Sequence, residues 1–491
     1  MSSIRKKIGR RLRGAILKRP RRLLFRTRAG GAVSAGGTGI PETINEVRPF
    51  RAEHYNPDKI ENIGLCLSRP YDVISPLEQD EYYRRHPLNV IRLILNRIEK
   101  DDTDSNNRYT RARDLLAQWR REQVIVSYRR PSFWVYEQDF QAEGLPRRHL
   151  SGFIGLVRLQ DYDSGRILPH ENVIREPLED RIRLTRTTHT QFEYIWGIYP
   201  DPQHAVDDIL ARCDRDIQVL DHTEKTTQVR HHLWRLVNPA QCEAISREVV
   251  RKRIYIADGH HRYQTMLTIR DELRKQHPDA GPNAPWEFIM MYLVSANQEG
   301  LTTLGTHRML RGLPPVSEQT IRDAGKLGFL VRAYSFGEEN EIEAREMWLR
   351  ELRDANPRDH KFGVALQGVN TYYILEIDEK RATRMVEGES GSLTLRLLDV
   401  SLLKSIVFKM LLGLTEEQIK PQITVHYTPK VPVALDAVHS GEIQSAWILN
   451  HTGLDEIMAV ADNREKMPQK STHFYPKPLS GLVFYNMNSV Q

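Results

Sequence analysis

The sequence predicts an α+β protein in which helices and strands are mixed along the chain. Several segments alternate apolar and polar residues with the period of a strand, others repeat apolar residues at helical spacing, and the two kinds are interleaved. The chain has 491 residues, of which 40% are hydrophobic, so it can bury a sizeable core and has the length of about three domains. It contains no apolar run of about 18 residues, which argues against a transmembrane helix.

The first predicted elements are two helices and three strands. PLEQDEYYRRHP begins with Pro and predicts a short helix, and residues 105–123 predict a longer amphipathic helix. Residues 132–140, 149–159 and 193–199 are rich in aromatic and branched side chains, which favour strands.

The middle of the chain predicts helices, a strand–turn–helix unit and a pair of strands. HAVDDILARCDRD and residues 239–252 have helical spacing. RIYIAD, which ends at Asp258, predicts a strand, and HHRYQTMLTIRDELRKQ predicts the helix that follows it. Residues 287–296 predict a buried strand, and residues 300–310 predict its partner.

The later part of the chain continues this alternation. SEQTIRDAGKLG and LDEIMAVADN predict helices, and FLVRAYSFG predicts a strand. Residues 393–413 are strongly apolar at helical spacing and end at Gly413, a residue type that commonly closes helices. The predicted parts of the chain are a basic disordered tail with a Gly-rich linker at 1–46, a region at 47–313 that holds the DGHHR motif, an α/β insertion or subdomain at 314–390, and a C-terminal α/β segment at 391–491 that completes the site.

The positive charge of the chain lies in its N-terminal tail. The net charge is +7, but residues 1–41 contain twelve Lys or Arg and no acid, so the other 450 residues carry a net charge of −5. Such a block is typical of a solvated extension without a specific role, of an arm that contacts nucleic acid or an anionic membrane, or of a transit peptide.

The cysteines give an expectation about the compartment. Cys66, Cys213 and Cys242 are widely spaced and odd in number, which argues against a disulfide framework or a zinc site. We therefore expect a protein of the reducing cytoplasm.

The segment YIADGHHRYQTML concentrates titratable residues on one turn between the predicted strand and helix. Gly259 permits a tight turn, and His260, His261 and Arg262 then lie at a helix N-terminus, where unpaired N–H groups favour an anion. An Arg can bind phosphate through two hydrogen bonds, and a His can titrate near neutral pH. Asp258 could orient a His, bind a metal or act as a base. The turn therefore predicts a phosphate or nucleotide site.

Two other interpretations of this turn stay open. The two His side chains could be satisfied inside a helix cap, with Asp258 as the capping residue. A zinc site is a weaker interpretation, because adjacent His residues point in different directions and no third ligand has standard spacing. The metal ligands therefore stay unassigned.

Other polar residues are candidates for the same site. Glu171 and Asp72 lie close after prolines in predicted loops and could act as a base or bind Mg²⁺, although an Asp in a loop is also typical of an ordinary turn. His307 and Arg308 end a predicted strand that we expect beside the motif. The predicted catalytic residues are Asp258, Glu171, Asp72 and His261; the predicted phosphate- or nucleotide-binding residues are Gly259, His260, His261, Arg262, His307, Arg308 and Lys470; and the predicted substrate-binding residues are Tyr71, Asn89, Arg92, Arg181 and Lys477.

Several motifs together resemble domain-of-unknown-function family 1015, over most of the chain from about residue 47 to the end. They are ADGHHRYQTML, RPFRAEHYNP, RPYDVISPLE, HPLNVIRL, LPHENVIREPLEDRIRL, MMYLVSANQEGLTTLGTHRML and MPQKSTHFYPKPLSGLVFY. The chain departs from the family pattern at Val173, where the family usually has Thr, so a hydroxyl role at this position is in doubt.

The turn also resembles, more distantly, the phosphate-holding turn of ParB/sulfiredoxin-like proteins, among them a nucleotide-dependent free-serine kinase with a similar Asp-Gly-His-His-Arg turn. This resemblance implies a ParB/sulfiredoxin-like core around the strand–turn–helix unit. It also implies that His260, His261 and Arg262 hold phosphates, with Asp258 nearby.

We therefore expect an enzyme that binds ATP or ADP with Mg²⁺ and phosphorylates a small hydroxyl metabolite, which the resemblance suggests is serine-like. One alternative is a ParB-like nucleotide-binding switch or DNA-associated protein, although no helix-turn-helix stands out. Another is a phosphohydrolase that uses the same residues on water. The absence of G-x-x-x-x-G-K-[ST] excludes a P-loop NTPase, and the absence of G-x-S-x-G argues against an α/β-hydrolase.

Overall fold

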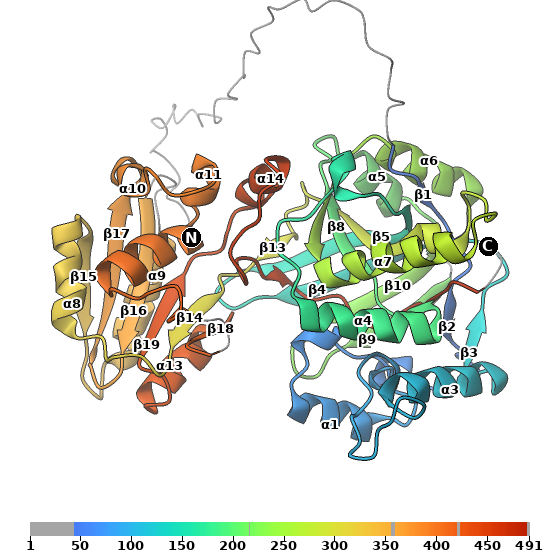
Figure 1. Cartoon of the computed structure of the whole chain (residues 1–491), viewed down its shortest axis with the longest axis horizontal. Coiled ribbons are helices and arrows are strands. Elements are labelled where there is room, and N and C mark those ends of the chain that lie inside the picture. The colour runs from blue at the N-terminus through green and yellow to red at the C-terminus, as the bar shows by residue number, and fades with distance from the viewer. Residues whose placement is uncertain (1–43, 216, 355–358, 420–422, 489–491) are drawn as a thin grey trace, which may run out of the picture. The chain divides into compact units, whose positions relative to one another are not determined.

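The computed structural model of the chain has the predicted mixed α+β architecture (Figure 1). It describes residues 44–488 except 216, 355–358 and 420–422, so the predicted basic tail lies outside the described residues. Most strands belong to two sheets, one of nine strands and one of six. Within the described ranges, no helix is both long enough and apolar enough to cross a bilayer.

The nine-stranded sheet is mixed and contains the strand that leads into the DGHHR motif. Its order is β6-β11-β8-β12-β5-β4-β10-β9, with β1 paired to β5. Strand β11 is parallel to β6 and antiparallel to β8. Every residue of β8 and β12 is buried, as expected for continuous apolar strands. The strands are β1 (Val47–Arg48), β4 (Phe133–Gln141), β5 (Arg147–Arg158), β6 (Ile167–Leu168), β8 (Ile195–Tyr199), β9 (Gln218–Thr223), β10 (Arg230–Leu236), β11 (Ile254–Asp258) and β12 (Phe288–Ser295).

Helices α4 (Arg175–Thr188) and α7 (His260–Gln276) pack against each other beside this sheet, and α3 (Arg108–Arg121) packs on α4 (Figure 1). Helix α7 buries eight residues, which lie on more than one face because the helix is covered by both the sheet and α4.

Several helices begin at side-chain caps that the sequence supplies. Ser75 caps α1 (Pro76–Arg85) in a capping box with Glu78, and Asn238 caps α6 (Pro239–Val249), which has Pro at its first position. Other helices are α2 (Ile91–Ile94), α5 (Ala205–Ala211), α8 (Glu318–Asp323), α9 (Glu341–Arg353), α10 (Glu379–Met385), α13 (Val431–His439) and α14 (Leu454–Asp462), with short 3₁₀ turns η1 (Ile63–Cys66), η2 (Tyr71–Val73), η3 (Tyr162–Ser164), η4 (Pro285–Glu287) and η5 (Ala324–Leu327).

The six-stranded sheet is antiparallel throughout, in the order β15-β17-β16-β19-β14-β18. Its strands come from either side of residues 314 and 391, which were two of the predicted domain boundaries; those boundaries stay predictions. The strands are β14 (His307–Leu310), β15 (Leu330–Ser335), β16 (Asp359–Leu366), β17 (Thr371–Asp378), β18 (Val425–Thr428) and β19 (Ser445–Leu449).

The predicted pairing of residues 300–310 with residues 287–296 is wrong. Strand β13 (Thr302–Thr303) pairs with β20 (Phe474–Tyr475), and β14 belongs to the six-stranded sheet. Both edges of β12 are already occupied, because β5 and β8 pair with it, so no edge is left for a hairpin partner.

The predicted single helix over residues 393–413 is interrupted. The chain forms α11 (Leu393–Arg396), α12 (Asp399–Leu402) and then a π-helix, η6 (Leu403–Leu411). The break lies at Leu398, whose ψ of 137° is extended rather than helical. Gly413 has a φ of +66°, the left-handed conformation expected of a glycine that closes a helix.

The C-terminal segment joins separate parts of the fold. Besides the pairing of β20 with β13, strand β21 (Tyr485–Asn486) pairs with β7 (Thr190–Gln191). Single bridges join this segment to Ser68 and to β2 (Glu53–Tyr55), which also pairs with β3 (Ile125–Ser127). As a result, Lys477, near the C-terminus, reaches Asp258 at the end of β11.

Candidate functional site

The predicted strand–turn–helix unit is confirmed. Strand β11 ends at Asp258, Gly259 has a φ of +94°, and α7 begins at His260. A Cβ atom at position 259 would lie 3.0 Å from Ile195 Cδ1 and 3.2 Å from Arg262 Cζ, so both the backbone conformation and the close packing favour glycine here.

Asp258 is held between two cations. Its Oδ2 atom accepts a hydrogen bond from Arg262 Nη2 at 2.7 Å, and its Oδ1 atom pairs with Lys477 Nζ. Arg262 Nη1 also donates to the carbonyl oxygen of Tyr194 at 2.8 Å. Although burial acts to raise it, the charges of Lys477 and Arg262 hold the pKa of Asp258 well below its usual range. Asp258 is therefore an ionised anchor for these cations and a weak proton acceptor.

His260 and His261 hold the loop that carries Glu171. The backbone N–H of His170 donates to His260 Nε2 at 3.3 Å, and that of Ile174 donates to His261 Nε2 at 2.9 Å. A ring nitrogen that accepts a hydrogen bond carries no proton, so both rings are neutral in this arrangement. Burial lowers the pKa of both residues, in agreement with neutral rings.

Glu171 is the carboxylic acid of the site that is best suited to exchange a proton near neutral pH. Burial raises the pKa of Glu171 to about 7, although the charges of Lys470 and Lys477 act to lower it. Its Oε2 atom lies 4.0 Å from His260 Nδ1, and its side chain stays 25% exposed. A carboxyl with this pKa and access to solvent has the properties of a general base.

Two exposed side chains of the site have no ion-pair partner among the described residues. They are Asp72, on η2, and Lys470, whose φ of +57° is a strained conformation for a residue with a side chain. The charge of Asp72 acts on the pKa values of Glu171, His261 and Arg262, and that of Lys470 acts on Glu171 and His261. Both side chains therefore lie close to the DGHHR motif and are free to bind a ligand.

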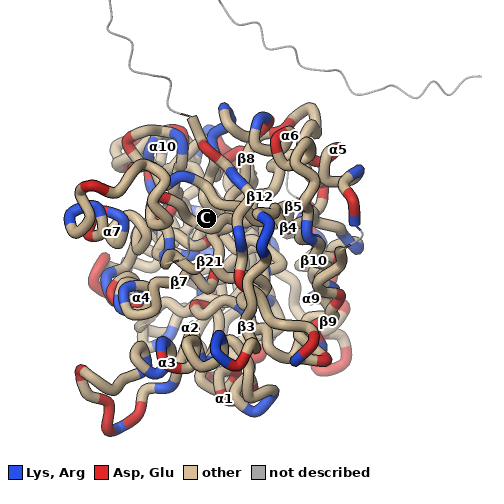
Figure 2. The backbone as a smooth tube through the Cα atoms, turned by 90° about the vertical axis from the view of Figure 1, so that its right-hand side faces the viewer, with Lys and Arg blue, Asp and Glu red and all other residues tan. Residues whose placement is uncertain are grey.

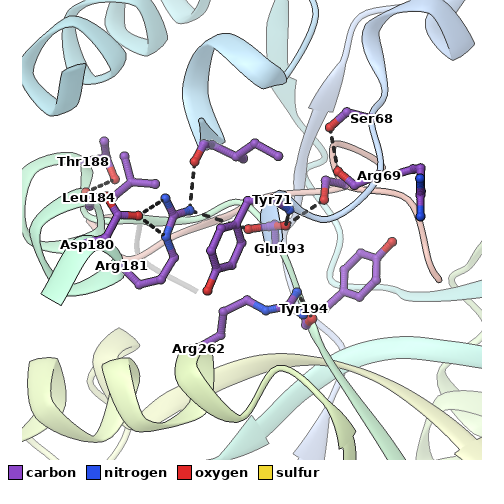
Figure 3. Close-up of polar contacts among 12 residues, drawn as sticks. Ser68, Arg69, Tyr71, Asp180, Arg181, Leu184, Thr188, Glu193, Tyr194 and Arg262 are labelled. Atoms are coloured by element: carbon purple, nitrogen blue, oxygen red, sulfur yellow. Dashed lines mark hydrogen bonds and ion pairs between the residues drawn. The ribbon is translucent and has the colours of Figure 1, made fainter. Parts of the chain in front are cut away.

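A buried network of polar contacts holds η2 in place (Figure 3). Glu193 Oε1 accepts hydrogen bonds from the backbone N–H of Tyr71 at 3.2 Å and from Ser480 Oγ at 2.8 Å. The Arg181 guanidinium lies 3.9 Å from the centre of the Tyr71 ring, and Nη1 lies 3.8 Å from Glu193 Oε2. Sequence reasoning missed Glu193; the available signal was an acid inside the apolar stretch QFEYIWGIY.

The positive charge of Arg262 is maintained by this network. Burial acts to lower the pKa of Arg262, but the charges of Glu193, Asp258 and Asp72 raise it above its ordinary value. Arg181 thus contacts both Tyr71 and Glu193, and Arg262 donates to the carbonyl oxygen of Tyr194, the residue after Glu193 (Figure 3).

Three other predicted residues use their side chains within the fold. Asn89 is fully buried and donates to the carbonyl oxygens of Leu65 and Leu67, and Arg92 donates to that of Tyr83. His307 accepts a hydrogen bond from the backbone N–H of Leu449 at 3.3 Å, inside the six-stranded sheet. Ligand contacts by these residues stay predictions.

The strand of His307 and Arg308, which we expect beside the motif, does not pair with the strand of the motif, since β14 and β11 belong to different sheets. Arg308 nevertheless reaches the C-terminal segment, because its Nη2 atom donates to the carbonyl oxygen of Lys470 at 3.2 Å.

A metal site made by the protein alone is not found in the described part of the chain. No group of three or more His, Cys, Asp or Glu side chains there has an arrangement that could hold a metal ion. The cysteines are buried and unpaired.

Residues 47–401 match the model of a family described as a protein of unknown function, DUF1015. The chain belongs to this family. Lys470 and Lys477 lie beyond the matched range, so two cations of the site in this DUF1015 protein come from its C-terminal segment.

No curated protein matches the chain. Among solved structures, it is similar to a mutant of free serine kinase in complex with AMP, with 10% identity and a TM-score of 0.30 over 65% of this chain and 86% of the kinase. It is also similar to a conserved hypothetical protein from Pyrococcus furiosus (12% identity, TM-score 0.29, 67% and 92% covered). A third similar structure is SbnI with a C-terminal truncation from Staphylococcus aureus, with 11% identity and a TM-score of 0.31 over 67% of this chain and 85% of that chain.

Proposed function

We propose that this DUF1015 protein is a nucleotide-dependent phosphotransferase that acts on a small hydroxyl metabolite, with Glu171 as its general base. The observation that carries the proposal is the Glu171 carboxyl, whose pKa burial raises to about 7, beside an exposed lysine. Phosphoryl transfer depends mainly on positioning and on neutralising phosphate charge, together with a group that orients the attacking hydroxyl. Glu171 and the cations around it supply these functions.

The cations divide into two roles in this proposal. Lys470 forms no ion pair with a described residue and is exposed, so it is available for a phosphate oxygen. Arg262 and Lys477 are already paired with Asp258, which positions them at the end of β11. His260 and His261 keep the Glu171 loop in place through their hydrogen bonds to backbone N–H groups.

The residues present fit a Mg²⁺ ion that is held largely by the nucleotide. Mg²⁺ in such sites takes one or two carboxylates, and phosphate oxygens and waters complete its coordination. Asp72 is the exposed carboxylate that could supply one ligand, whereas Asp258 is occupied by two cations. When bound, the ion would neutralise charge on the phosphates.

ATP or ADP is the proposed nucleotide, and a serine-like compound is the proposed acceptor. The AMP and ADP named for free serine kinase only indicate which nucleotides to test first.

Phosphohydrolysis is a second candidate function, because the side chain of Glu171 is 25% exposed and water can therefore reach it.

The DNA-associated alternative is not supported by the charge pattern of the described chain, because acidic and basic residues are interspersed along it (Figure 2).

Product analysis by ³¹P NMR tests the proposal. The full chain is incubated with Mg²⁺ and ATP or ADP, with and without serine and related hydroxyl compounds. We expect a phosphorylated acceptor, and we expect Glu171→Gln to lower turnover by about 100-fold or more while the Kd for nucleotide changes little. Glu179→Gln is the matched control, since Glu179 is exposed and pairs with Arg175 on the surface.

Wild-type turnover in Glu171→Gln would contradict the assignment of the base. Release of inorganic phosphate without a phosphorylated acceptor would instead support the hydrolase.

A further inference from the structure

Two adjoining cavities of about 310 and 300 Å³ lie beside the C-terminal segment. Both are lined by Lys404, Glu416 and Pro468, so they are neighbours. The second cavity is also lined by Asn172, the residue after Glu171. The cavities thus extend to the loop that carries the proposed base.

Three cations at these cavities have no acidic partner among the described residues. Arg308 Nη2 donates to the carbonyl oxygen of Lys470 at 3.2 Å, and its side chain is buried, with the whole residue only 5% exposed. Lys466 Nζ donates to the carbonyl of Pro169 at 2.8 Å, and Arg396 Nη1 to that of Val386 at 2.9 Å. Backbone carbonyls orient these groups but do not neutralise their charges.

Leaving these three cations without an opposite charge beside the cavities costs free energy. Arg308 is buried, and Arg396 and Lys466 are half-buried. A cation in such a place loses hydration that hydrogen bonds to neutral groups replace only in part. Burial lowers the pKa of Arg308 to about 10 and that of Lys466 to about 8, so both are still mainly protonated at pH 7. An anionic ligand would supply the missing charge.

The acids at the cavities do not meet this need. Glu416 is shared between Lys404 at 2.8 Å and Lys409 at 2.7 Å. Glu389 lines the second cavity but forms no ion pair with Arg396 or Lys466.

The π-helix η6 provides an independent observation. Leu403, Lys404 and Phe408 of this helix line the first cavity, and Lys404, Ser405 and Lys409 line the second. π-Helical geometry is rare and is found frequently at functional sites. In this chain it places cationic and apolar side chains on the same cavities.

We propose that these two cavities bind a ligand that carries a chain of phosphates. Arg308, Arg396 and Lys466 pair with the phosphates, and apolar side chains from η6 and β18 contact the organic part of the ligand. The phosphate chain then ends beside Asn172 and the Glu171 loop. This inference deepens the proposed function and rests on it for the identity of the ligand as a nucleotide.

Thermal unfolding of the full chain with ADP, pyrophosphate or citrate tests the inference. Arg308→Met and Lys466→Met should each weaken binding of ADP and pyrophosphate by about tenfold or more, because each variant removes a charge that pairs with phosphate. Arg308→Met should change the Tm of the free protein little, since it removes a buried charge that has no acidic partner among the described residues, along with its hydrogen bonds to backbone carbonyls. Arg311→Met is the matched control: Arg311 follows β14, is 55% exposed and lies near Glu442, so binding should not change.

The outcomes separate this inference from the proposed function. ADP and pyrophosphate binding of wild-type strength in both Met variants would overturn it, as would equal stabilisation by citrate and pyrophosphate. So would the absence of any shift with both phosphates. Pyrophosphate binding that depends on Arg308, without ADP binding, would support the cavity site and contradict the nucleotide. Loss of turnover in Glu171→Gln with intact ADP binding bears only on the base.

Discussion

At the scale of single residues, Glu171 shows how burial and charge compete at one carboxyl group. Its pKa of about 7 lies above the ordinary value of 4.5, so the folded protein holds this proton more tightly than the unfolded chain does. Between these two values the folded state binds more protons, and its stability therefore falls as the pH rises.

Glu171→Gln should remove this pH dependence. At pH 8 the variant should be more stable than the wild type, by an amount on the order of 2 kcal/mol, and the difference should shrink towards pH 4. Urea unfolding at both pH values measures the difference. A stability that changes with pH as much in the variant as in the wild type would contradict the raised pKa.

Asp258 is expected to behave in the opposite way, since it is stabilised in its charged form. Asp258→Asn leaves Lys477 and Arg262 without a carboxylate in a buried site, which should lower the free energy of unfolding by about 3 kcal/mol. Asp462→Asn is the control: Asp462 pairs with Arg253 at the surface, and its loss should cost less than about 1 kcal/mol. Urea unfolding measures both losses. Equal losses in the two variants would show that the buried ion pairs of Asp258 contribute no more to the free energy of unfolding than a surface pair does.

The sequence predicts the residue types of the site better than their partners. Asp258, His260, His261 and Arg262 are adjacent in sequence, so their position on one turn could be inferred from local pattern alone. The pairing of Asp258 with Lys477 joins residues 219 positions apart and depends on the path of the C-terminal segment. The hydrogen bonds that the two histidines accept from the Glu171 loop could not be predicted for the same reason.

At the scale of elements, the turn between β11 and α7 depends on Gly259. Gly259→Ala should lower stability by about 2 kcal/mol, because alanine is strained at a φ of +94° and its Cβ would meet Ile195 and Arg262. Gly312→Ala separates the two causes, since Gly312 has a φ of +70° but no atom lies within 4 Å of the place that an alanine methyl group would occupy. Thermal unfolding of both variants gives the comparison, and an equal loss would mean that packing at position 259 contributes nothing.

Elements with clear local signals match their predictions, and the exceptions have tertiary causes. The helix that begins after Ser75 has both its cap and its proline in the sequence. The apolar stretch at 393–413 gives no local sign of the break at Leu398 or of the π-helix that follows. These features arise where the stretch packs against the rest of the fold, and the proposed phosphate cavities depend on them.

At the scale of the whole molecule, the C-terminal segment connects the site to the core. Phe484 is fully buried, its ring lies 5.8 Å from those of Tyr55 and Phe192, and its backbone bridges to Glu53. Phe484→Ala should therefore cost about 3–5 kcal/mol, measured by urea unfolding. A loss below about 1 kcal/mol would mean that the segment is only loosely attached.

Sheet order could not be predicted from the sequence. Residues 300–310 have the pattern of a strand, but the pattern does not show that β5 and β8 already occupy both edges of β12. The same limit applies to the six-stranded sheet, whose strands come from distant segments. The mixed α+β class could be predicted because it depends only on which elements occur and in what order.

Isothermal titration of ADP and ATP into the full chain, with and without Mg²⁺, tests the central claim most directly, because every role proposed for the site requires a bound nucleotide. We predict saturable binding with a Kd in the micromolar range, about −8 kcal/mol in free energy, that Glu171→Gln preserves. The titrations are run on protein shown to be folded and at more than one temperature, because the binding enthalpy changes with temperature. The absence of binding heat for both nucleotides at every temperature would contradict the account.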